Sequence, residues 1–292
     1  MKIYKVACHF LLFAIMINCS AKQSIGVQGH RGCRGVLPEN SLPAFKRAVE
    51  LGVQTLEMDV VVSKDRKVVV SHEPFISRFY CLDPFSNEIP LVDDMAYNLY
   101  EMTYDSIRQF DCGSKQHPRF PEQQNMRTFK PLMTEVFDLA DSLNRHIAYN
   151  IELKARPDYD VLYTPYPADF VQLVLKDIEE KQVFQRCNLQ SFDVRILEEV
   201  KKQAPEMSVA LLVDETESIE EKLKELSFQP EIISPYFELL SKEVVAKYQA
   251  SGYRIIPWTV NETAHIQRMI DYKVNSIITD YPLRALQLLS KE

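Results

Sequence analysis

Short runs of apolar residues alternate with longer amphipathic segments along most of the chain, and this alternation predicts its architecture. The apolar runs are continuous, which is typical of strands that are buried on both faces of a parallel sheet. They predict strands at 25–28, 55–62, 148–153, 188–192, 209–213, 232–236, 254–260 and 276–279. Between them, apolar residues recur every three or four positions, which predicts helices at 41–51, 168–180, 194–203, 219–226, 242–250 and 263–272.

This series of strand–helix units matches a (β/α)8 barrel in number and size, so we predict an α/β fold of the TIM-barrel class. A doubly wound open sheet is the alternative. It is less favoured because no glycine-rich dinucleotide loop follows the first strand. The helix at 41–51 carries boundary signals, since Ser41 can cap its first turn, Pro43 suits that turn, and Gly52 follows its last residue.

The apolar run 67–72 breaks the alternation. It follows the second strand too closely for a parallel crossover, so the two segments are predicted to form an antiparallel hairpin. If Asp65 and Arg66 form a two-residue loop, the register places Asp59 opposite His72 at the C-terminal mouth of the barrel.

Residues 73–129 show no clear hydrophobic period, and we interpret them as an insertion or small lobe that overhangs the mouth of one domain spanning 24–290. The 292-residue chain contains 46% hydrophobic and 26% charged residues, a mixture typical of a globular protein with a sizeable core. Its formal net charge is −7 and no stretch is rich in Lys or Arg, which argues against a nucleic-acid partner.

The first residues predict export. Residues 1–18 combine Lys2 and Lys5 with an apolar run that is too short to span a bilayer, as in a secretory signal peptide. The run ends on Cys19, as in a loose lipoprotein box, so Cys19 is predicted to carry a lipid anchor. The alternative is an ordinary small-residue cleavage site that ends at Ala21. Either way, we predict a bacterial protein that is periplasmic or anchored to the membrane.

Four further cysteines lie beyond the signal segment, and none of them forms a CxxC pair, so a zinc site is not predicted. An exported protein can hold disulfides. Four cysteines allow three full connectivities, and we favour a bond between Cys81 and Cys112, because both lie in the least regular part of the chain. Four buried free thiols are the alternative.

Three carboxylates are predicted to meet at one edge of the sheet. Glu57 and Asp59 alternate along the second strand, so both side chains face the barrel interior, and Glu152 lies at the end of the third parallel strand. Buried carboxylates are costly unless a cation neutralises them. A site made only of oxygen ligands suits one hard divalent cation, Ca²⁺ or Mg²⁺.

Histidines and fixed cations are predicted to stand beside these carboxylates. His30 and Arg31 follow the first strand, His72 ends the hairpin, and Lys154 lies two residues after Glu152. This set suits phosphate ester cleavage, in which the cations hold the phosphoryl oxygens and the histidines transfer protons. The other histidines lack such neighbours: His117, His146 and His265 are predicted to be structural or exposed, and His9 belongs to the signal segment.

Residues 29–73, GHRGCRGVLPENSLPAFKRAVELGVQTLEMDVVVSKDRKVVVSHE, resemble the signature region of the glycerophosphodiester phosphodiesterase family. The motifs HRG, PEN and ExD and a downstream histidine occur in the family's order and spacing. Later segments are also similar to family blocks: 131–136, 152–154, 258–261 and 279–282. The resemblance covers about 27–286 and is weakest in the insertion.

The resemblance implies a TIM-barrel hydrolase that converts a glycerophosphodiester and water to glycerol 3-phosphate and an alcohol. Glu73 stands where the family usually has Asp after the second histidine. The implied roles are His30 and His72 as the acid/base pair; Glu57, Asp59 and Glu152 as metal ligands; Arg31 and Lys154 as phosphate contacts; Trp258 as an aromatic surface for the glycerol part; and Glu39 and Asn40 as supporting residues.

Several alternatives stay open at this point. Lys154 can instead pair only with Glu152, and Trp258 can pack in the core. Either histidine can be the acid, and the attacking group is water or the substrate's own glycerol hydroxyl. A phosphodiesterase acting on phospholipids or lysophospholipids is an alternative function, and a non-catalytic glycerophosphodiester-binding lipoprotein is another.

Overall fold

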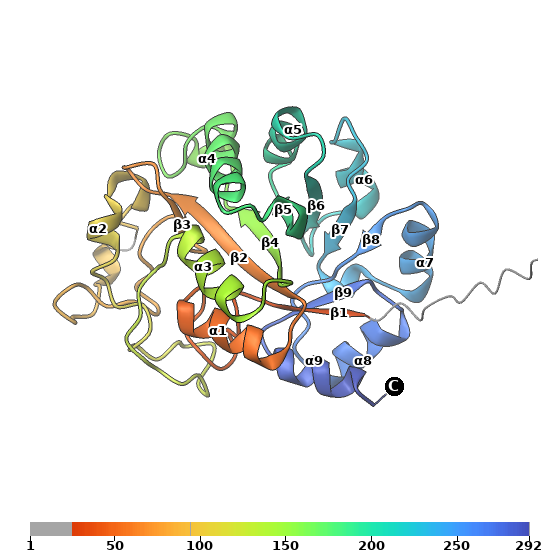
Figure 1. Ribbon diagram of the computed structural model, residues 1–292, viewed down its shortest axis with the longest axis horizontal. Helices are drawn as coiled ribbons and strands as arrows, with labels where there is room; N and C mark the ends of the chain where they lie inside the picture. The colour runs from red at the N-terminus through yellow and green to blue at the C-terminus, as the bar shows by residue number, and fades with distance from the viewer. Residues whose placement is uncertain (1–24, 94, 292) are drawn as a thin grey trace, which may run out of the picture.

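A computed structural model describes residues 25–93 and 95–291, in which parallel strands form a nearly closed barrel surrounded by helices (Figure 1). Neighbouring strands follow the order β8-β7-β6-β5-β4-β2-β1-β9, and β3 is added to β2 in the antiparallel sense. The predicted barrel is therefore confirmed. The strand bounds are β1 Gly26–Gly29, β2 Thr55–Val62, β3 Val68–Val70, β4 Ala148–Leu153, β5 Cys187–Ser191, β6 Ser208–Val213, β7 Ile232–Pro235, β8 Arg254–Ile255 and β9 Ser276–Thr279.

Backbone hydrogen bonds close the barrel between β8 and β9. Asn275 N donates to Ile255 O at 2.9 Å, and Ile278 N donates to Pro257 O at 3.0 Å. These bonds exclude the open doubly wound sheet. The strand predicted at 254–260 is wrong beyond Ile255, because Pro257 has no N–H group and interrupts the regular ladder.

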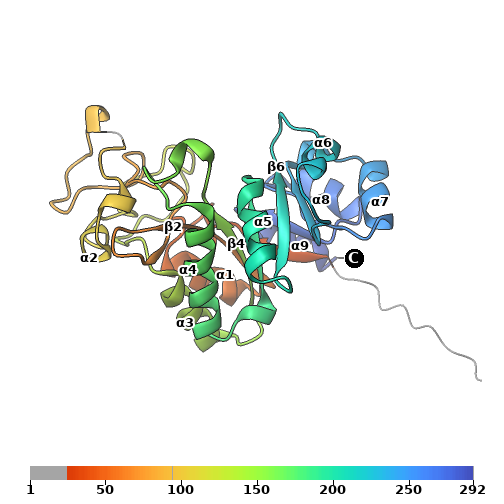
Figure 2. The same ribbon diagram turned by 90° about the horizontal axis from the view of Figure 1, so that it is seen from above.

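The helices cover the outside of the barrel (Figures 1 and 2). Ser41 caps α1 by accepting from Ala44 N at 3.4 Å, and Gly52 ends the helix in the left-handed region with φ +89°. Three helices of the described residues were not predicted: α2 in the insertion, α3 before β4, and α9 after β9. The bounds are α1 Leu42–Leu51, α2 Tyr104–Ile107, α3 Met133–Leu143, α4 Pro167–Glu180, α5 Val194–Gln203, α6 Ile219–Lys224, α7 Lys242–Ala250, α8 Thr263–Asp271 and α9 Pro282–Leu289, with short 3-10 helices at Leu91–Asp93, Leu99–Glu101, Pro157–Tyr159, Phe184–Arg186 and Phe237–Leu239.

The hairpin of β2 and β3 exists, but its predicted register is wrong by one residue. Asp59 O accepts from Ser71 N at 3.0 Å, so Asp59 lies opposite Ser71 rather than His72. The cause is the turn: Arg66 adopts a left-handed conformation with φ +61°, and the loop closes between Ser63 and Lys67 instead of spanning two residues.

The insertion, residues 73–129, packs on the side of the hairpin and projects from the barrel around α2 (Figure 2). It has a hydrophobic core of its own, built around Ile76, Leu99 and Ile107 and joined to Val61 and Val69 of the hairpin. A disulfide joins Cys81 to Cys112, the pair favoured by the sequence, whereas Cys33 and Cys187 are buried free thiols.

None of the helices in the described part of the chain is long and apolar enough to cross a membrane. The predicted signal segment 1–18 and the predicted anchor Cys19 lie outside the described residues.

Candidate active site

A cavity of about 220 Å³ opens at the C-terminal mouth of the barrel, where the strand ends converge. The loops after β1, β3 and β8, the strands themselves and the insertion all contribute to its wall. The lining residues are His30, Arg31, Arg34, Glu57, His72, Arg119, Glu152, Lys154, Gln190, Phe192, Leu212, Trp258, Thr259 and Ile278.

The three predicted metal ligands meet at this cavity. One carboxylate oxygen from each of Glu57, Asp59 and Glu152 lies within 4.8 Å of the others, and all three residues are buried. Asp59 is the register partner of Glu152, and Glu57 lies on the same face of β2 as Asp59. Parallel pairing of β2 with β4 therefore brings together groups that are almost a hundred positions apart.

Crowding of buried carboxylates changes their acidity. Burial, together with the charges of Asp59 and Glu152, raises the pKa of Glu57 well above its usual range. Burial likewise raises the pKa of Glu152 to about 7, against the opposing effect of Lys154. Removal from water and mutual repulsion thus favour protonation when no cation is present.

The donor set fits a hard divalent cation. Asp59 Oδ1 is buried and accepts no hydrogen bond, so it retains a free ligand position. Lys154 Nζ lies 2.6 Å from Glu152 Oε1 and 3.8 Å from Asp59 Oδ1, which places its ammonium group against two of the three carboxylates. Carboxylate oxygens are ligands that Ca²⁺ and Mg²⁺ prefer.

His30 is held by a carboxylate behind it. Its Nδ1 lies 2.6 Å from Asp280 Oδ1, and Asn261 Nδ2 donates to the other oxygen, Asp280 Oδ2, at 2.7 Å. An ionised Asp280 requires the proton on Nδ1, which leaves the lone pair of Nε2 towards Glu57 Oε2, 4.0 Å away. Burial lowers the pKa of His30 despite the opposing effect of Asp280, so the neutral imidazole can accept a proton.

His72 has an equivalent support. Its Nδ1 lies 2.9 Å from Glu73 Oε1, and the Tyr80 hydroxyl donates to Glu73 Oε2 at 2.5 Å. Burial, followed by the charges of Arg31 and Lys154, lowers the pKa of His72 to about 4. Glu73, which stands in place of the family's usual Asp, therefore still reaches the imidazole.

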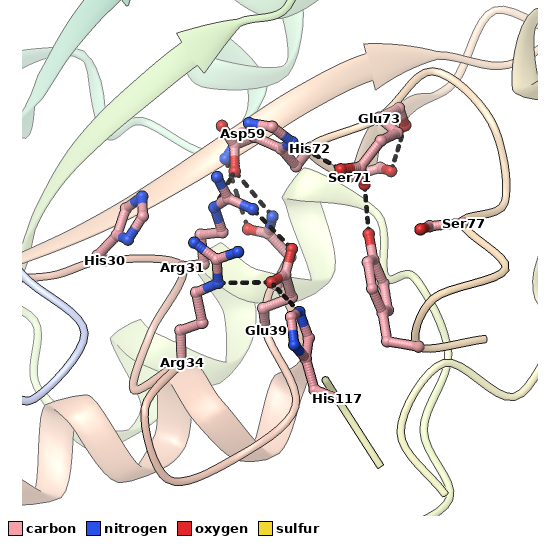
Figure 3. A network of polar contacts seen from close by, with 12 residues as sticks. His30, Arg31, Arg34, Glu39, Asp59, Ser71, His72, Glu73, Ser77 and His117 are labelled. Atoms are coloured by element: carbon pink, nitrogen blue, oxygen red, sulfur yellow. Dashed lines mark hydrogen bonds and ion pairs between the residues drawn. The ribbon is translucent and has the colours of Figure 1, made fainter. Parts of the chain in front are cut away.

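Arginines and Glu39 form a buried polar network beside the carboxylates (Figure 3). Arg31 Nη1 donates to Glu39 Oε1 at 2.7 Å and its Nε lies 3.1 Å from Asp59 Oδ2. Arg34 Nε lies 2.6 Å from Glu39 Oε2. Asn40 Nδ2 donates to Asp59 Oδ2 at 2.9 Å. Glu39 and Asn40, which were predicted as supporting residues, thus contact Arg31 and Asp59 directly.

The backbone at the HRG motif is shaped for this network. Arg31 has a φ of +49°, and its N–H donates to Glu57 Oε2 at 3.0 Å. Gly32 follows with φ +84°, and a Cβ at that position would lie 2.6 Å from the backbone carbon of Ala44 in α1. Only glycine fits both the conformation and the close packing of α1 against the loop.

Aromatic side chains and one amide side chain also line the cavity. Trp258 is half-buried, its Nε1 donates to Ser234 O at 2.8 Å, and its ring meets Phe192 edge-on at 5.5 Å. Gln190 Nε2 donates to Glu57 Oε1 at 3.0 Å and so helps to fix the position of that carboxylate. The indole therefore lines the cavity with its position fixed by a hydrogen bond and an aromatic contact.

The structure brings every predicted site residue to the cavity or into direct contact with a residue that lines it. Lys154 both pairs with Glu152 and lines the cavity, so the two interpretations of this residue are compatible. His117 is buried, His146 is exposed and His265 packs against Phe237. No role was predicted for Arg34, Arg119, Gln190, Phe192, Asn261 or Asp280. Asp280 directly follows a buried strand, which is a usable signal in a barrel.

Comparisons with known proteins agree with this geometry. Residues 30–284 match the family described as the glycerophosphoryl diester phosphodiesterase family. The chain is 30% identical to a glycerophosphodiester phosphodiesterase of Caldanaerobacter subterraneus subsp. tengcongensis, over 91% of this chain and 98% of that one.

Solved structures are similar as well. A putative glycerophosphoryl diester phosphodiesterase from Silicibacter pomeroyi has a TM-score of 0.84 and 30% identity, covering 93% of this chain and 95% of that one. An Oleispira antarctica phosphodiesterase, solved in complex with the product sn-glycerol-3-phosphate, shares the fold with a TM-score of 0.71 at 20% identity, covering 92% and 98% of the two chains.

Proposed function

Because the chain belongs to the glycerophosphoryl diester phosphodiesterase family, we propose that it hydrolyses glycerophosphodiesters to glycerol 3-phosphate and an alcohol. The observation that carries this proposal is one cavity that combines a cluster of three carboxylates, two carboxylate-supported histidines and fixed cations. Each of these groups has a task in phosphodiester cleavage, and a binding protein would not require the paired imidazoles.

Glu57, Asp59 and Glu152 would hold one divalent cation, which neutralises charge on the phosphoryl oxygens and favours attack at phosphorus. Lys154 and Arg31 line the same cavity, so their charges bind and orient the anionic diester.

His30 and His72 supply proton transfer. One neutral imidazole takes a proton from the attacking oxygen through its Nε2, and the other ring, protonated on both nitrogens, delivers its Nε2 proton to the oxygen of the departing alcohol. The P–O bond to that alcohol breaks as the new P–O bond forms. Asp280 and Glu73 keep the Nδ1 proton of each ring in place, and each ring therefore keeps its Nε2 for the substrate.

Purified protein tests the proposal directly. Glycerophosphocholine turnover is measured by release of glycerol 3-phosphate, with added divalent cation and after chelation. We expect loss of activity on chelation, and a similar loss in His30→Ala and Asp59→Asn. His146→Ala, which removes an exposed histidine that does not line the cavity, serves as the control. Full activity of His30→Ala, or turnover that does not depend on a metal, would overturn the mechanism.

The cation is proposed to be Ca²⁺ or Mg²⁺, since the three protein ligands are all carboxylates. Calorimetric titration of the metal-free protein with each ion, which compares the two affinities, decides between them. Preference for a thiophilic or nitrogen-seeking metal would argue against the ligand set.

Lysophospholipids and intact phospholipids are included in the same assay as competing substrates. Faster turnover of a lysophospholipid than of glycerophosphocholine would replace the proposed substrate class. Tight binding of glycerophosphocholine to the metal-loaded protein without turnover would indicate a binding protein instead.

We also propose that the chain is exported and anchored by a lipid on Cys19. The signal-like segment 1–18 and the disulfide between Cys81 and Cys112 support export, because disulfides persist in oxidising compartments. Metabolic labelling with a fatty-acid analogue tests the anchor. Label in the wild type and none in Cys19→Ala is the expected result; an unlabelled, released wild type would favour cleavage at Ala21.

A further inference from the structure

Tyr80 lies in the insertion and does not line the cavity, yet it contacts two groups that hold residues of the cavity. We propose that Tyr80 is a positioning residue: its hydroxyl group fixes His72 through Glu73, and its ring supports Glu39 through His117. The inference deepens the proposed hydrolysis and rests on it. The insertion would then contribute to the reaction, although its sequence pattern gave no sign of such a role.

The hydroxyl contact divides the Glu73 carboxylate between two partners. Oε2 accepts from the Tyr80 hydroxyl at 2.5 Å, while Oε1 lies 2.9 Å from His72 Nδ1. Glu has one more rotatable bond than the Asp usual at this position in the family, so its carboxylate has more freedom to leave the imidazole. The side chain is also 25% exposed, which allows water to compete for it. The buried Tyr80 hydroxyl is a second donor to this carboxylate, and it restricts the movement of the Glu73 side chain.

The ring contact reaches the arginines. The Tyr80 and His117 rings are stacked at 5.4 Å with an interplanar angle of 9°. His117 Nδ1 accepts from Arg119 N at 3.1 Å, so its proton is on Nε2, which lies 3.5 Å from Glu39 Oε2. Glu39 is the carboxylate that holds the guanidinium groups of Arg31 and Arg34, two residues that line the cavity (Figure 3).

Tyr80 can act as a support because its own position is constrained. It is 7% exposed, and it immediately precedes Cys81, which is bonded to Cys112. Cys81 N donates to Ser77 O at 2.9 Å, and Leu82 N donates to Asp111 O at 2.7 Å. The segment is therefore held by a covalent bond and by backbone hydrogen bonds on both sides of the tyrosine.

Tyr80→Phe removes the hydroxyl group and keeps the stacked ring, whereas Tyr80→Leu removes both. We expect Tyr80→Phe to lower kcat for glycerophosphocholine by about tenfold, as for loss of an orienting partner of a site ligand, with KM little changed. Tyr80→Leu is expected to raise KM in addition, because the support of Glu39 is lost.

Tyr104 provides the matched control. It is equally buried in the same lobe, and its hydroxyl donates to Glu135 Oε2 at 2.6 Å, but it does not contact the cavity network. Tyr104→Phe should leave kcat unchanged. A double-mutant cycle checks the route: in a Glu73→Ala background, Tyr80→Phe should have almost no further effect on kcat.

Nitrogen NMR of the His72 imidazole gives a readout that does not depend on turnover. Wild type should show one tautomer with the proton on Nδ1, and Tyr80→Phe should show a mixture. An unchanged kcat and an unchanged His72 spectrum in Tyr80→Phe would overturn the inference, as would an equal fall of kcat in Tyr104→Phe. If the wild type hydrolyses no glycerophosphodiester, the proposed function fails, and the spectrum alone then decides whether Tyr80 positions His72.

Discussion

Replacing Asp280 with asparagine tests whether the tautomer of His30 matters for catalysis. Asn261 Oδ1 accepts from Asp280 N at 2.9 Å, which fixes the Asn261 amide with its Nδ2 donor towards residue 280. In Asp280→Asn the new amide must therefore keep its oxygen towards Asn261 and turn its NH₂ group towards His30. His30 Nδ1 then has to accept, and the proton moves to Nε2, the nitrogen that faces the cavity.

The expected loss follows from this geometry. A hydrogen bond to a charged group contributes about 1.5–3 kcal/mol, so its loss alone lowers kcat by roughly 10- to 150-fold. A base held in the wrong tautomer costs up to about 10⁴-fold. We therefore expect a fall of at least about tenfold. Since the Asp280 charge raises the pKa of His30, its removal should also lower that pKa.

The assay is steady-state release of glycerol 3-phosphate from glycerophosphocholine, with the variant's thermal unfolding measured alongside. Asp193→Asn is the matched control, because Asp193 is a buried carboxylate that binds Arg195 and does not line the cavity. A correctly folded Asp280→Asn protein with kcat within about threefold of wild type would refute the reasoning.

Three further predictions concern stability and reactivity. Because the pKa values of Glu57 and Glu152 are raised, the folded metal-free protein binds more protons than the unfolded chain. Above pH 6.5 its unfolding temperature should therefore fall as the pH rises through about 7, and the stabilisation by a divalent cation should increase over the same range. A metal effect on the unfolding temperature that does not depend on pH would contradict this prediction. Phe137→Ala should cost about 3–5 kcal/mol of unfolding free energy in urea titrations, since the ring is fully buried against Tyr149, and a cost below about 1 kcal/mol would be inconsistent with that packing. Burial raises the pKa of the Cys33 thiol to about 12, so a thiol reagent should modify it only after unfolding, as followed by mass spectrometry of the native and denatured protein.

Much of the barrel was predictable because strands buried on both faces leave continuous apolar runs, and helices packed on one side leave a period of three or four. The prediction was wrong where a single residue decides the backbone. Pro257 ends the regular part of β8, and the left-handed Arg66 shifts the hairpin register by one. Neither effect is visible in hydrophobicity, because both depend on backbone conformation.

The sequence by itself determined the candidate chemistry of this protein. The HRG and ExD motifs pointed to His30, Glu57 and Asp59 as candidate site residues, because the spacing within one strand fixes which side chains share a face. Only the tertiary structure decided which groups hold these site side chains in position. Asp280 reaches His30 because β9 pairs with β1, which lies near the other end of the chain. Tyr80 and His117 reach the groups around the cavity because the disulfide-bonded insertion packs against the β2–β3 hairpin beside them. These contacts join residues that are distant in sequence, and they depend on barrel closure and packing rather than on local pattern.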